Sequence, residues 1–108
     1  MTESEFNDLV DDILISIEDQ LDEYESDIDC ETSTGILTLS MPNSSQIIIN
    51  RQRPTQQLWL AAKSGGFHFE YNNETGDWLD TRRGDKFFDS LNRCLQEQTG
   101  ETFNLSYD

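Results

Sequence analysis

Residues 1–31 read MTESEFNDLVDDILISIEDQLDEYESDIDCE, and the rest of the chain is organised around this stretch. It holds thirteen carboxylates and no lysine or arginine, and the first basic residue of the chain is Arg51. The other 77 residues hold nine acids and all seven bases, so they contribute only −2 of the net charge of −15. The negative charge is therefore a local feature that needs a local explanation.

Apolar residues recur at helical spacing from about Ser4 to Tyr24, which predicts an amphipathic helix with one buried stripe. Thr2 and Glu5 have the spacing of a capping box at its start, and acids in the first turn suit the positive end of the helix dipole. The residues of the stripe are Phe6, Leu9, Val10, Ile13, Leu14, Ile17, Leu21 and Tyr24.

The acids later in this helix do not favour its stability. Asp22, Glu23 and Glu25 lie near the negative end of the dipole, where each anion is unfavourable by roughly 0.3–1 kcal/mol. Three like-charged pairs at i, i+4 each cost roughly 0.2–0.5 kcal/mol: Glu18/Asp22, Asp19/Glu23 and Asp8/Asp12. Two interpretations remain, namely a solvated, solubilising face and a surface kept acidic for a function.

After Tyr24 the pattern changes to alternation, with Asp27, Asp29 and Glu31 interleaved with less polar residues. This predicts a strand over Ile28–Thr32 that carries its acids on one face. If the strand lies beside the end of the helix, the two acidic rows join into one ridge.

The remainder predicts an antiparallel meander followed by a second helix and an extended tail packed against the helices, Thr102–Tyr107. The helix runs from Gly84 or Asp85 to Thr99, with Gly100 as its C-cap. Two amphipathic helices flanking one sheet predict a two-layer α+β sandwich in a single domain, residues 1–108, with both helices on the same face. The later strands are expected at Ile36–Met41, Gln46–Gln52, Gln57–Lys63, Phe67–Tyr71 and Asp77–Asp80.

The other sheet face must then meet water. Trp59 shares that face with polar residues and with His68, so it is either a contact residue for a partner or a ring shielded by the stems of arginine or lysine.

Composition narrows the class of protein. The N-terminus is acidic and lacks the apolar core of a signal peptide, and no apolar run is long enough to span a bilayer, so we expect a cytoplasmic protein. Cys30 and Cys94 lie at positions expected to be buried, as reduced core thiols. The charge of −15 disfavours nucleic acids and anionic membranes, and it favours metal cations or a protein with a basic patch.

Three pieces of sequence together resemble the sheet signature of frataxins, and the bacterial members of that family resemble this chain most in length. The pieces are residues 47–54 (IIINRQRP), 58–61 (LWLA) and 65–69 (GGFHF). Residues 4–6, the acidic helix, residues 27–31 and the helix beginning with Phe87 and Phe88 follow in the order of the family. The resemblance covers essentially the whole chain.

The resemblance implies a sandwich of two helices on an antiparallel sheet of five to six strands. It also implies weak iron binding and a role in iron–sulfur cluster assembly, with a cysteine desulfurase and the scaffold protein as partners. The family's iron-binding acids map to Glu18, Asp19, Asp22, Glu23, Glu25, Asp27, Asp29 and Glu31. The partner-binding residues map to Glu18, Asp19, Asp22 and Glu23 for the desulfurase and to Asn50, Gln52, Trp59 and His68 for the scaffold.

The available ligands suit weak binding of metal ions at the protein surface rather than a closed coordination site. Carboxylates are hard oxygen ligands that suit Fe³⁺, Mg, Ca or Mn and are usable by Fe²⁺. No cluster of cysteine and histidine in the sequence closes a coordination shell. We therefore expect weak, multi-site iron binding with which other divalent cations compete, by a protein that is a monomer without metal.

Two other classes of protein are alternatives, an enzyme and an acidic decoy. An enzyme is not expected. His68 has no nucleophile near it in sequence, and no phosphate-binding or dinucleotide glycine motif is present. Paired acids on a convex helix also lack the cleft that glycoside hydrolysis needs. Iron oxidation at the acids is neither required nor excluded. An acidic decoy that mimics nucleic acid explains the charge equally well but gives no role to Trp59 or His68.

Overall fold

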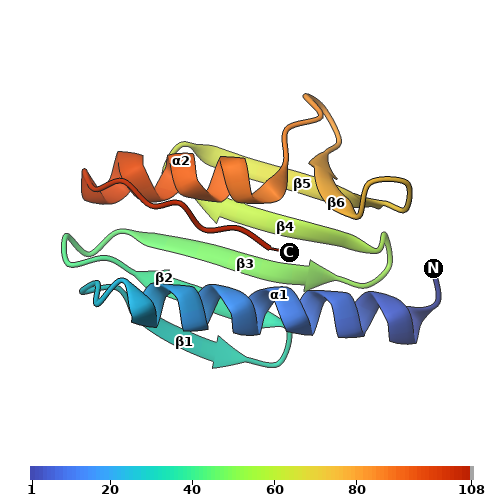
Figure 1. The fold of residues 1–108 in the computed structure, drawn as a ribbon, viewed down its shortest axis with the longest axis horizontal. Coiled ribbons are helices and arrows are strands. Elements are labelled where there is room, and N and C mark those ends of the chain that lie inside the picture. The colour runs from blue at the N-terminus through green and yellow to red at the C-terminus, as the bar shows by residue number, and fades with distance from the viewer. Residues whose placement is uncertain (108) are drawn as a thin grey trace.

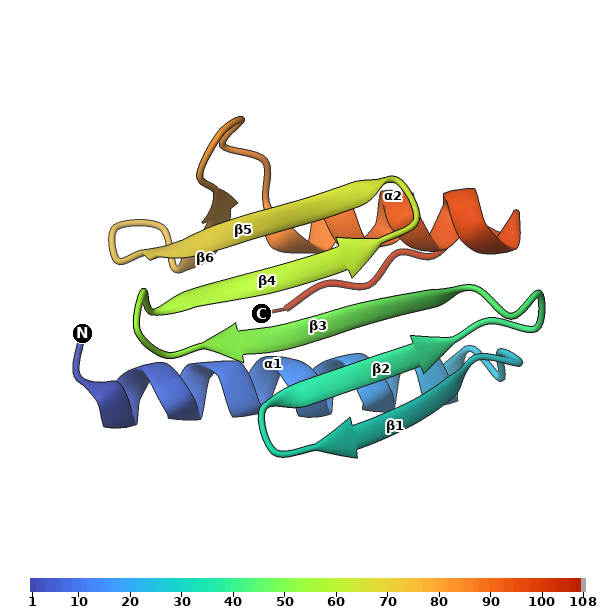
Figure 2. The ribbon, with the colours of Figure 1, turned by 180° about the vertical axis from the view of Figure 1, so that it is seen from behind.

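The computed structural model describes residues 1–107 as two layers, with two helices covering one face of a six-stranded antiparallel sheet (Figures 1 and 2). The strands follow one another across the sheet in chain order, so the predicted meander is confirmed. The elements are α1 (Glu3–Glu23), β1 (Asp29–Ser33), β2 (Ile36–Ser40), β3 (Gln46–Gln52), β4 (Gln57–Ala62), β5 (Gly65–Asn72), β6 (Asp77–Asp80) and α2 (Phe87–Thr99).

The core lies between the helices and the covered face of the sheet. The apolar stripe of α1 is buried at Phe6, Val10, Ile13, Leu14, Ile17 and Leu21, which confirms the predicted period. The strands contribute alternate residues, because successive side chains of a strand point to opposite faces. Those buried from the central strands are Leu37, Leu39, Ile47, Ile49, Leu58, Leu60 and Phe69.

Two residues of the predicted helical stripe differ from expectation. Leu9 is only half-buried, and Tyr24 is 43% exposed. Tyr24 instead serves the C-terminal tail: its ring packs 5.0 Å from that of Phe103, and its hydroxyl accepts the N–H of Asn104 at 2.9 Å. Because the N–H of Asn104 lies at the surface, the tyrosine ring that reaches it stays partly exposed.

The predicted capping box is present, with Glu5 N–H donating to Thr2 Oγ1 at 3.1 Å and Thr2 N–H donating to Glu5 Oε1 at 3.0 Å. The second helix begins later than predicted. Residues 84–86 continue the contacts of the sheet, since Leu79 and Lys86 form a β-bridge and Asp80 N–H donates to Asp85 C=O at 2.8 Å. Helical dihedrals begin only at Phe87, and the helix ends at the left-handed cap Gly100 as predicted.

The tail runs between the two helices in extended form, as predicted (Figure 1). Each helix holds it with one amide side chain. Gln20 of α1 exchanges two hydrogen bonds with the backbone of Ser106, at 2.8 and 3.0 Å, and Asn92 of α2 does the same with Leu105, at 3.0 and 2.9 Å. The tail therefore fills the groove between α1 and α2.

The prediction that Cys30 is a core thiol is wrong, whereas Cys94 is buried as expected. The first strand begins at Asp29 rather than Ile28, and all five of its residues are exposed. The reason is its place in the sheet. β1 is the edge strand, paired only with β2, and it projects beyond α1 (Figure 2). Its side chains are therefore exposed, although Asp29 and Cys30 adjoin the end of α1.

Candidate metal- and partner-binding surface

The end of α1 and the start of β1 together form one acidic hollow of about 370 Å³. Five of the eight predicted metal-binding acids line it, from the last turns of the helix, the connecting turn and the first residue of the strand. The lining residues are Glu18, Asp19, Leu21, Asp22, Glu25, Ser26, Ile28, Asp29 and Cys30. We call this set of residues the acidic hollow.

Three predicted acids lie outside the acidic hollow. Glu23 is exposed at the last residue of α1, and Glu31 is exposed on β1. Asp27 precedes the strand and lines a separate hollow of about 260 Å³ with Pro42, Asn43 and the end of α2. The two acidic rows therefore meet at Glu18, Asp22 and Asp29, but they do not form one ridge along their whole length.

A sharp turn brings the two rows together. Glu25 follows the helix with a φ of 52°, in the left-handed region that few residues other than glycine adopt. Its N–H donates to Asp22 C=O at 3.1 Å. Ser26 comes next, and its Oγ is buried without a hydrogen-bond partner among the described residues. Strained dihedrals and unpaired polar atoms cluster at functional sites more often than elsewhere.

The acids of the hollow affect the ionisation of Cys30. The pKa of its thiol is raised, first by partial burial and then by the negative charges of Glu18, Asp29 and Asp22. A thiol held in its protonated form is a poor metal ligand, because the thiolate is the coordinating species. Oxygen donors therefore dominate the chemistry of the acidic hollow.

Within residues 1–107, no three side chains of histidine, cysteine, aspartate or glutamate gather closely enough to hold a metal ion as a preformed site. The carboxylates present suit a hard cation that is bound at the surface and keeps part of its water shell. Glu18, Asp19, Asp22, Glu25 and Asp29 would hold such an ion.

Among residues 1–107, the acids of the hollow also lack counter-ions. In the described part of the chain, the one ion pair of α1 joins Asp11 to Arg51 of β3, with Asp11 Oδ1 3.1 Å from Arg51 Nη1. Arg51 is 7% exposed at its side chain, and its partner Asp11 lies two helical turns before Glu18. The remaining negative charge is left facing solvent.

One apolar residue beside these acids was not predicted from the sequence. Ile15 is 59% exposed, and it lies three, four and seven positions before Glu18, Asp19 and Asp22. That spacing places it on the same face of α1 as these acids. The available signal was an apolar residue outside the buried stripe, flanked by carboxylates one turn away on both sides.

The outer face of the sheet carries the predicted scaffold residues in a row. Asn50, Trp59 and His68 lie directly opposite one another on β3, β4 and β5, and Gln52 of β3 pairs with Gln57. The rings of Trp59 and His68 stack with centroids 4.2 Å apart and planes 12° apart. Trp59 is thus half-buried, and its shield is an imidazole rather than the stem of an arginine or lysine.

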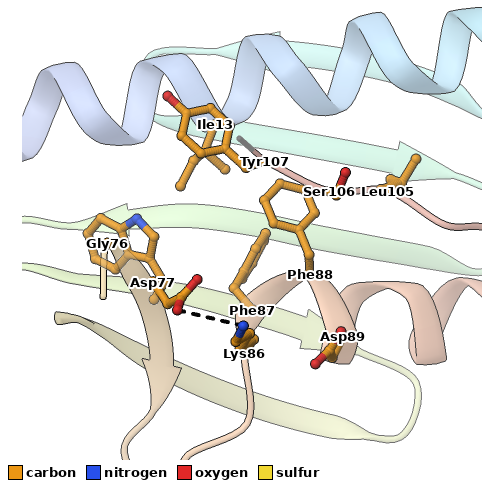
Figure 3. Close-up of a pocket in the computed structure, with 11 residues that line it drawn as sticks. Ile13, Gly76, Asp77, Lys86, Phe87, Phe88, Asp89, Leu105, Ser106 and Tyr107 are labelled. Atoms are coloured by element: carbon orange, nitrogen blue, oxygen red, sulfur yellow. Dashed lines mark ion pairs between the residues drawn. The ribbon is translucent and has the colours of Figure 1, made fainter. Parts of the chain in front are cut away.

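A third hollow, of about 220 Å³, lies where α1, β6, α2 and the tail meet (Figure 3). Four of its eleven lining residues are aromatic, and the Lys86–Asp77 ion pair crosses its edge with 3.7 Å between Nζ and Oδ2. Phe88 and Tyr107 lie with parallel rings 6.4 Å apart.

No helix in the described part of the chain is both long enough and apolar enough to cross a membrane.

These features define a small acidic protein with a two-layer α+β fold, an acidic hollow at one edge of the sheet and a Trp59–His68 stack on its open face. The chain belongs to the frataxin family. The family model of the frataxin-like domain matches residues 1–101.

Individual relatives agree with this assignment. The iron-sulfur cluster assembly protein CyaY of Photobacterium profundum is 49% identical over 106 residues, which cover 98% of this chain and 99% of that protein. The structure of frataxin from Psychromonas ingrahamii superposes with a TM-score of 0.91 at 38% identity, covering 99% of this chain and 100% of that one. Trimeric yeast frataxin, from Saccharomyces cerevisiae and complexed with ferrous iron, gives a TM-score of 0.72 at 32% identity, covering 86% and 87% of the two chains.

Proposed function

We propose that this protein is a non-enzymatic accessory protein of iron–sulfur cluster assembly. In this proposal its acidic hollow binds iron weakly and docks on a basic patch of the cysteine desulfurase. The name of the Photobacterium relative and the ferrous complex of the yeast relative support the pathway and the metal. The observation that carries the proposal is the meeting of Glu18, Asp22 and Asp29 at one hollow without counter-ions in the described chain.

Iron binding at such a surface is driven by charge. Two or three carboxylates share an ion that keeps part of its water shell, so affinity is low and other divalent cations compete. Salt weakens the binding, because exposed charges are screened beyond about 8 Å at physiological ionic strength.

Docking on a protein uses the same charges together with an apolar contact. A basic patch is attracted to the hollow at long range, which raises the association rate, and Ile15 supplies a side chain that a partner can bury among the acids. Bound iron reduces the negative charge of the hollow, so iron and desulfurase are coupled ligands of one surface.

The open face of the sheet would bind the scaffold protein. Aromatic residues dominate the energetics of many interfaces, and the Trp59–His68 stack is already ordered before a partner arrives. The protein then contacts the desulfurase and the scaffold through two different surfaces and supplies no catalytic group of its own.

The deciding experiment compares binding of the desulfurase to the wild type and to a variant of the acids at the end of α1. This variant, which we call the ridge variant, carries Glu18→Lys, Asp19→Lys, Asp22→Lys and Glu23→Lys. The matched control carries the same change in charge at four exposed acids elsewhere, namely Glu74→Lys, Asp89→Lys, Glu97→Lys and Glu101→Lys. Circular dichroism shows whether each variant is folded.

We expect the wild type and the control to bind and the ridge variant not to bind. Equal loss in both variants would mean that net charge alone decides, as for a general acidic decoy. Undiminished binding of the ridge variant would remove the docking role of the hollow and leave metal handling as its function.

A further inference from the structure

The edge of the sheet opposite β1 is only half covered. β5 runs from Gly65 to Asn72, but β6 pairs with residues 69–72 alone. In the described chain, no strand pairs with residues 65–68 on the side away from β4. In Figure 2 this half of β5 forms the upper border of the sheet. It is a short open edge.

The direction of the free backbone groups follows from one hydrogen bond. His68 C=O accepts the N–H of Thr81 at 2.9 Å, so the backbone groups of His68 point away from β4. Because the hydrogen-bonding direction alternates along a strand, the N–H and C=O of Gly66 point the same way. Gly66 and His68 are both exposed. Because Thr81 already uses the C=O of His68, the groups left for an extended chain to pair with are the N–H and C=O of Gly66 and the N–H of His68.

Basic side chains surround this open edge. Arg82 and Arg83 lie at its end with Thr81, where a hollow of about 180 Å³ is lined by Gly66, Phe67, His68 and residues 80–83. Arg93 of α2 covers the inner side of the strand, with its guanidinium 5.4 Å from the ring centroid of Phe67. Lys63 lies just before the strand.

Three of these cations, Lys63, Arg82 and Arg83, are exposed and free to meet a ligand. Within residues 1–107 none of the four basic residues at this edge forms an ion pair, although the chain has 22 acids. The one carboxylate lining the hollow, Asp80, is 7% exposed and accepts the backbone N–H groups of Arg82 and Arg83 at 2.7 and 3.1 Å. Asp80 thus shapes the loop and leaves both guanidinium groups in solvent.

We propose that residues 65–68 of β5 bind an extended acidic segment of a partner protein, which adds to the sheet as a further strand. Backbone pairing supplies affinity in this mode, and the flanking side chains supply specificity. The positive charges at the edge disfavour pairing with a second copy of the same edge and favour a strand of opposite charge. The site lies across the sheet from the acidic hollow and does not depend on the function proposed for it.

The test uses three synthetic peptides and the ¹⁵N-labelled full chain. The first peptide alternates glutamate and valine over seven residues, the second has lysine in place of glutamate, and the third is the acidic peptide with alternate backbone nitrogens methylated. Amide shifts are followed by NMR at each peptide addition. We expect the acidic peptide to shift the amides of Gly66, His68 and Thr81, and the other two peptides to leave them unchanged.

Two variants separate charge at the edge from charge in general. Arg82→Ser with Arg83→Ser should weaken binding of the acidic peptide about tenfold, which corresponds to two solvent-exposed ion pairs. The control Arg53→Ser removes an exposed arginine from the β3–β4 turn and should leave the affinity unchanged. Both substitutions lie outside the strands, so the sheet is retained.

Several results would overturn the proposal. Equal binding of the methylated peptide would show that no strand is added, and shifts confined to other residues would place the peptide elsewhere. If no amide signal shifts at millimolar peptide concentration, the edge does not bind acidic extended peptides. Shifts at residues 65–68 that depend on protein concentration alone would show that a second copy of the chain occupies the edge.

Discussion

The indole of Trp59 and the imidazole of His68 stack across two neighbouring strands, with centroids 4.2 Å apart. The two residues are direct cross-strand partners, and Trp59 Nε1–H also donates to Gln57 Oε1 at 2.8 Å. Both rings are therefore held in place on a face that no helix covers. A partner that binds there meets an ordered aromatic surface and loses little side-chain entropy on binding.

We expect Trp59→Ala to lower the affinity for the scaffold protein by about tenfold or more, as for an aromatic residue at the centre of an interface. His68→Ala should have a smaller effect in the same direction, because it removes the support of the ring. Titration calorimetry measures both. Thr38→Ala, on the same face of β2, is the control, and an equal loss in that variant would contradict a specific role for the stack.

Cations should stabilise the fold by reducing repulsion in α1. Three like-charged pairs at i, i+4 together cost about 1 kcal/mol, so their neutralisation should raise Tm by roughly 4 °C for a domain of this size. Calcium chloride should act at lower concentration than sodium chloride at equal ionic strength, because carboxylates bind the divalent ion directly. Thermal unfolding measures the effect, and a Tm that is flat or falls would contradict it.

Ile15→Ser should weaken desulfurase binding about tenfold while leaving Tm within a degree or so, because the side chain is exposed in the free protein and buried only against a partner. Ile36→Ser is the matched control, as Ile36 is 40% exposed on β2. If both variants bind like the wild type, the docking surface does not include the middle of α1.

The thiol of Cys30 reports the negative charge of the hollow. Its pKa is raised by burial and by Glu18, Asp29 and Asp22, so less of the reactive thiolate is present near neutral pH. In a Cys94→Ala background, Asp22→Asn should lower this pKa and speed alkylation by iodoacetamide severalfold. Asp8→Asn, near the start of α1, should leave the rate unchanged, and equal rates in both variants would contradict the assignment.

The same shift has a consequence for stability. The folded state holds the Cys30 proton more tightly than the unfolded chain does, so this contribution to stability is complete below the unfolded pKa. It is lost as the pH rises through the raised folded pKa. Unfolding by urea across the alkaline range should therefore show a smaller loss of stability in Cys30→Ser than in the wild type.

Glu25→Gly should raise stability by about 1 kcal/mol, since glycine adopts a φ of 52° without strain. Glu23→Gly is the matched control. Its residue is the last of the helix, so glycine there should destabilise by about 1 kcal/mol while removing the same charge. Urea unfolding distinguishes the two. A similar gain in both variants would mean that lost repulsion, rather than relieved strain, is the cause.

Much of the fold follows from periodicity alone. The spacing of Phe6, Val10 and Ile13 predicts α1 and its buried face, and the bounds of β3 and β6 were predicted to the residue. The capping box and Gly100 mark helix ends by local chemistry. These features depend on residues a few positions apart, where backbone geometry is nearly constant.

The boundaries that failed depend on contacts between distant segments. α2 begins at Phe87 because Leu79 and Lys86 form a bridge, and Tyr24 is exposed because its hydroxyl meets the tail. No local pattern in residues 84–86 or around Tyr24 contains the position of the partner segment. Sequence spacing is therefore silent about these contacts.

Composition and periodicity alone predict that thirteen acids gather in the first thirty-one residues and that nine of them lie on α1, away from its buried stripe. Only the tertiary structure decided which of them meet. The left-handed turn at Glu25 brings Asp29 to Glu18 and Asp22 and leaves Glu31 aside, and the edge position of β1 exposes Cys30. The physical reason is that the spacing of residues determines which face of a helix or strand a side chain lies on. The dihedral angles of one turn and the order of the strands determine which of these faces lie next to each other.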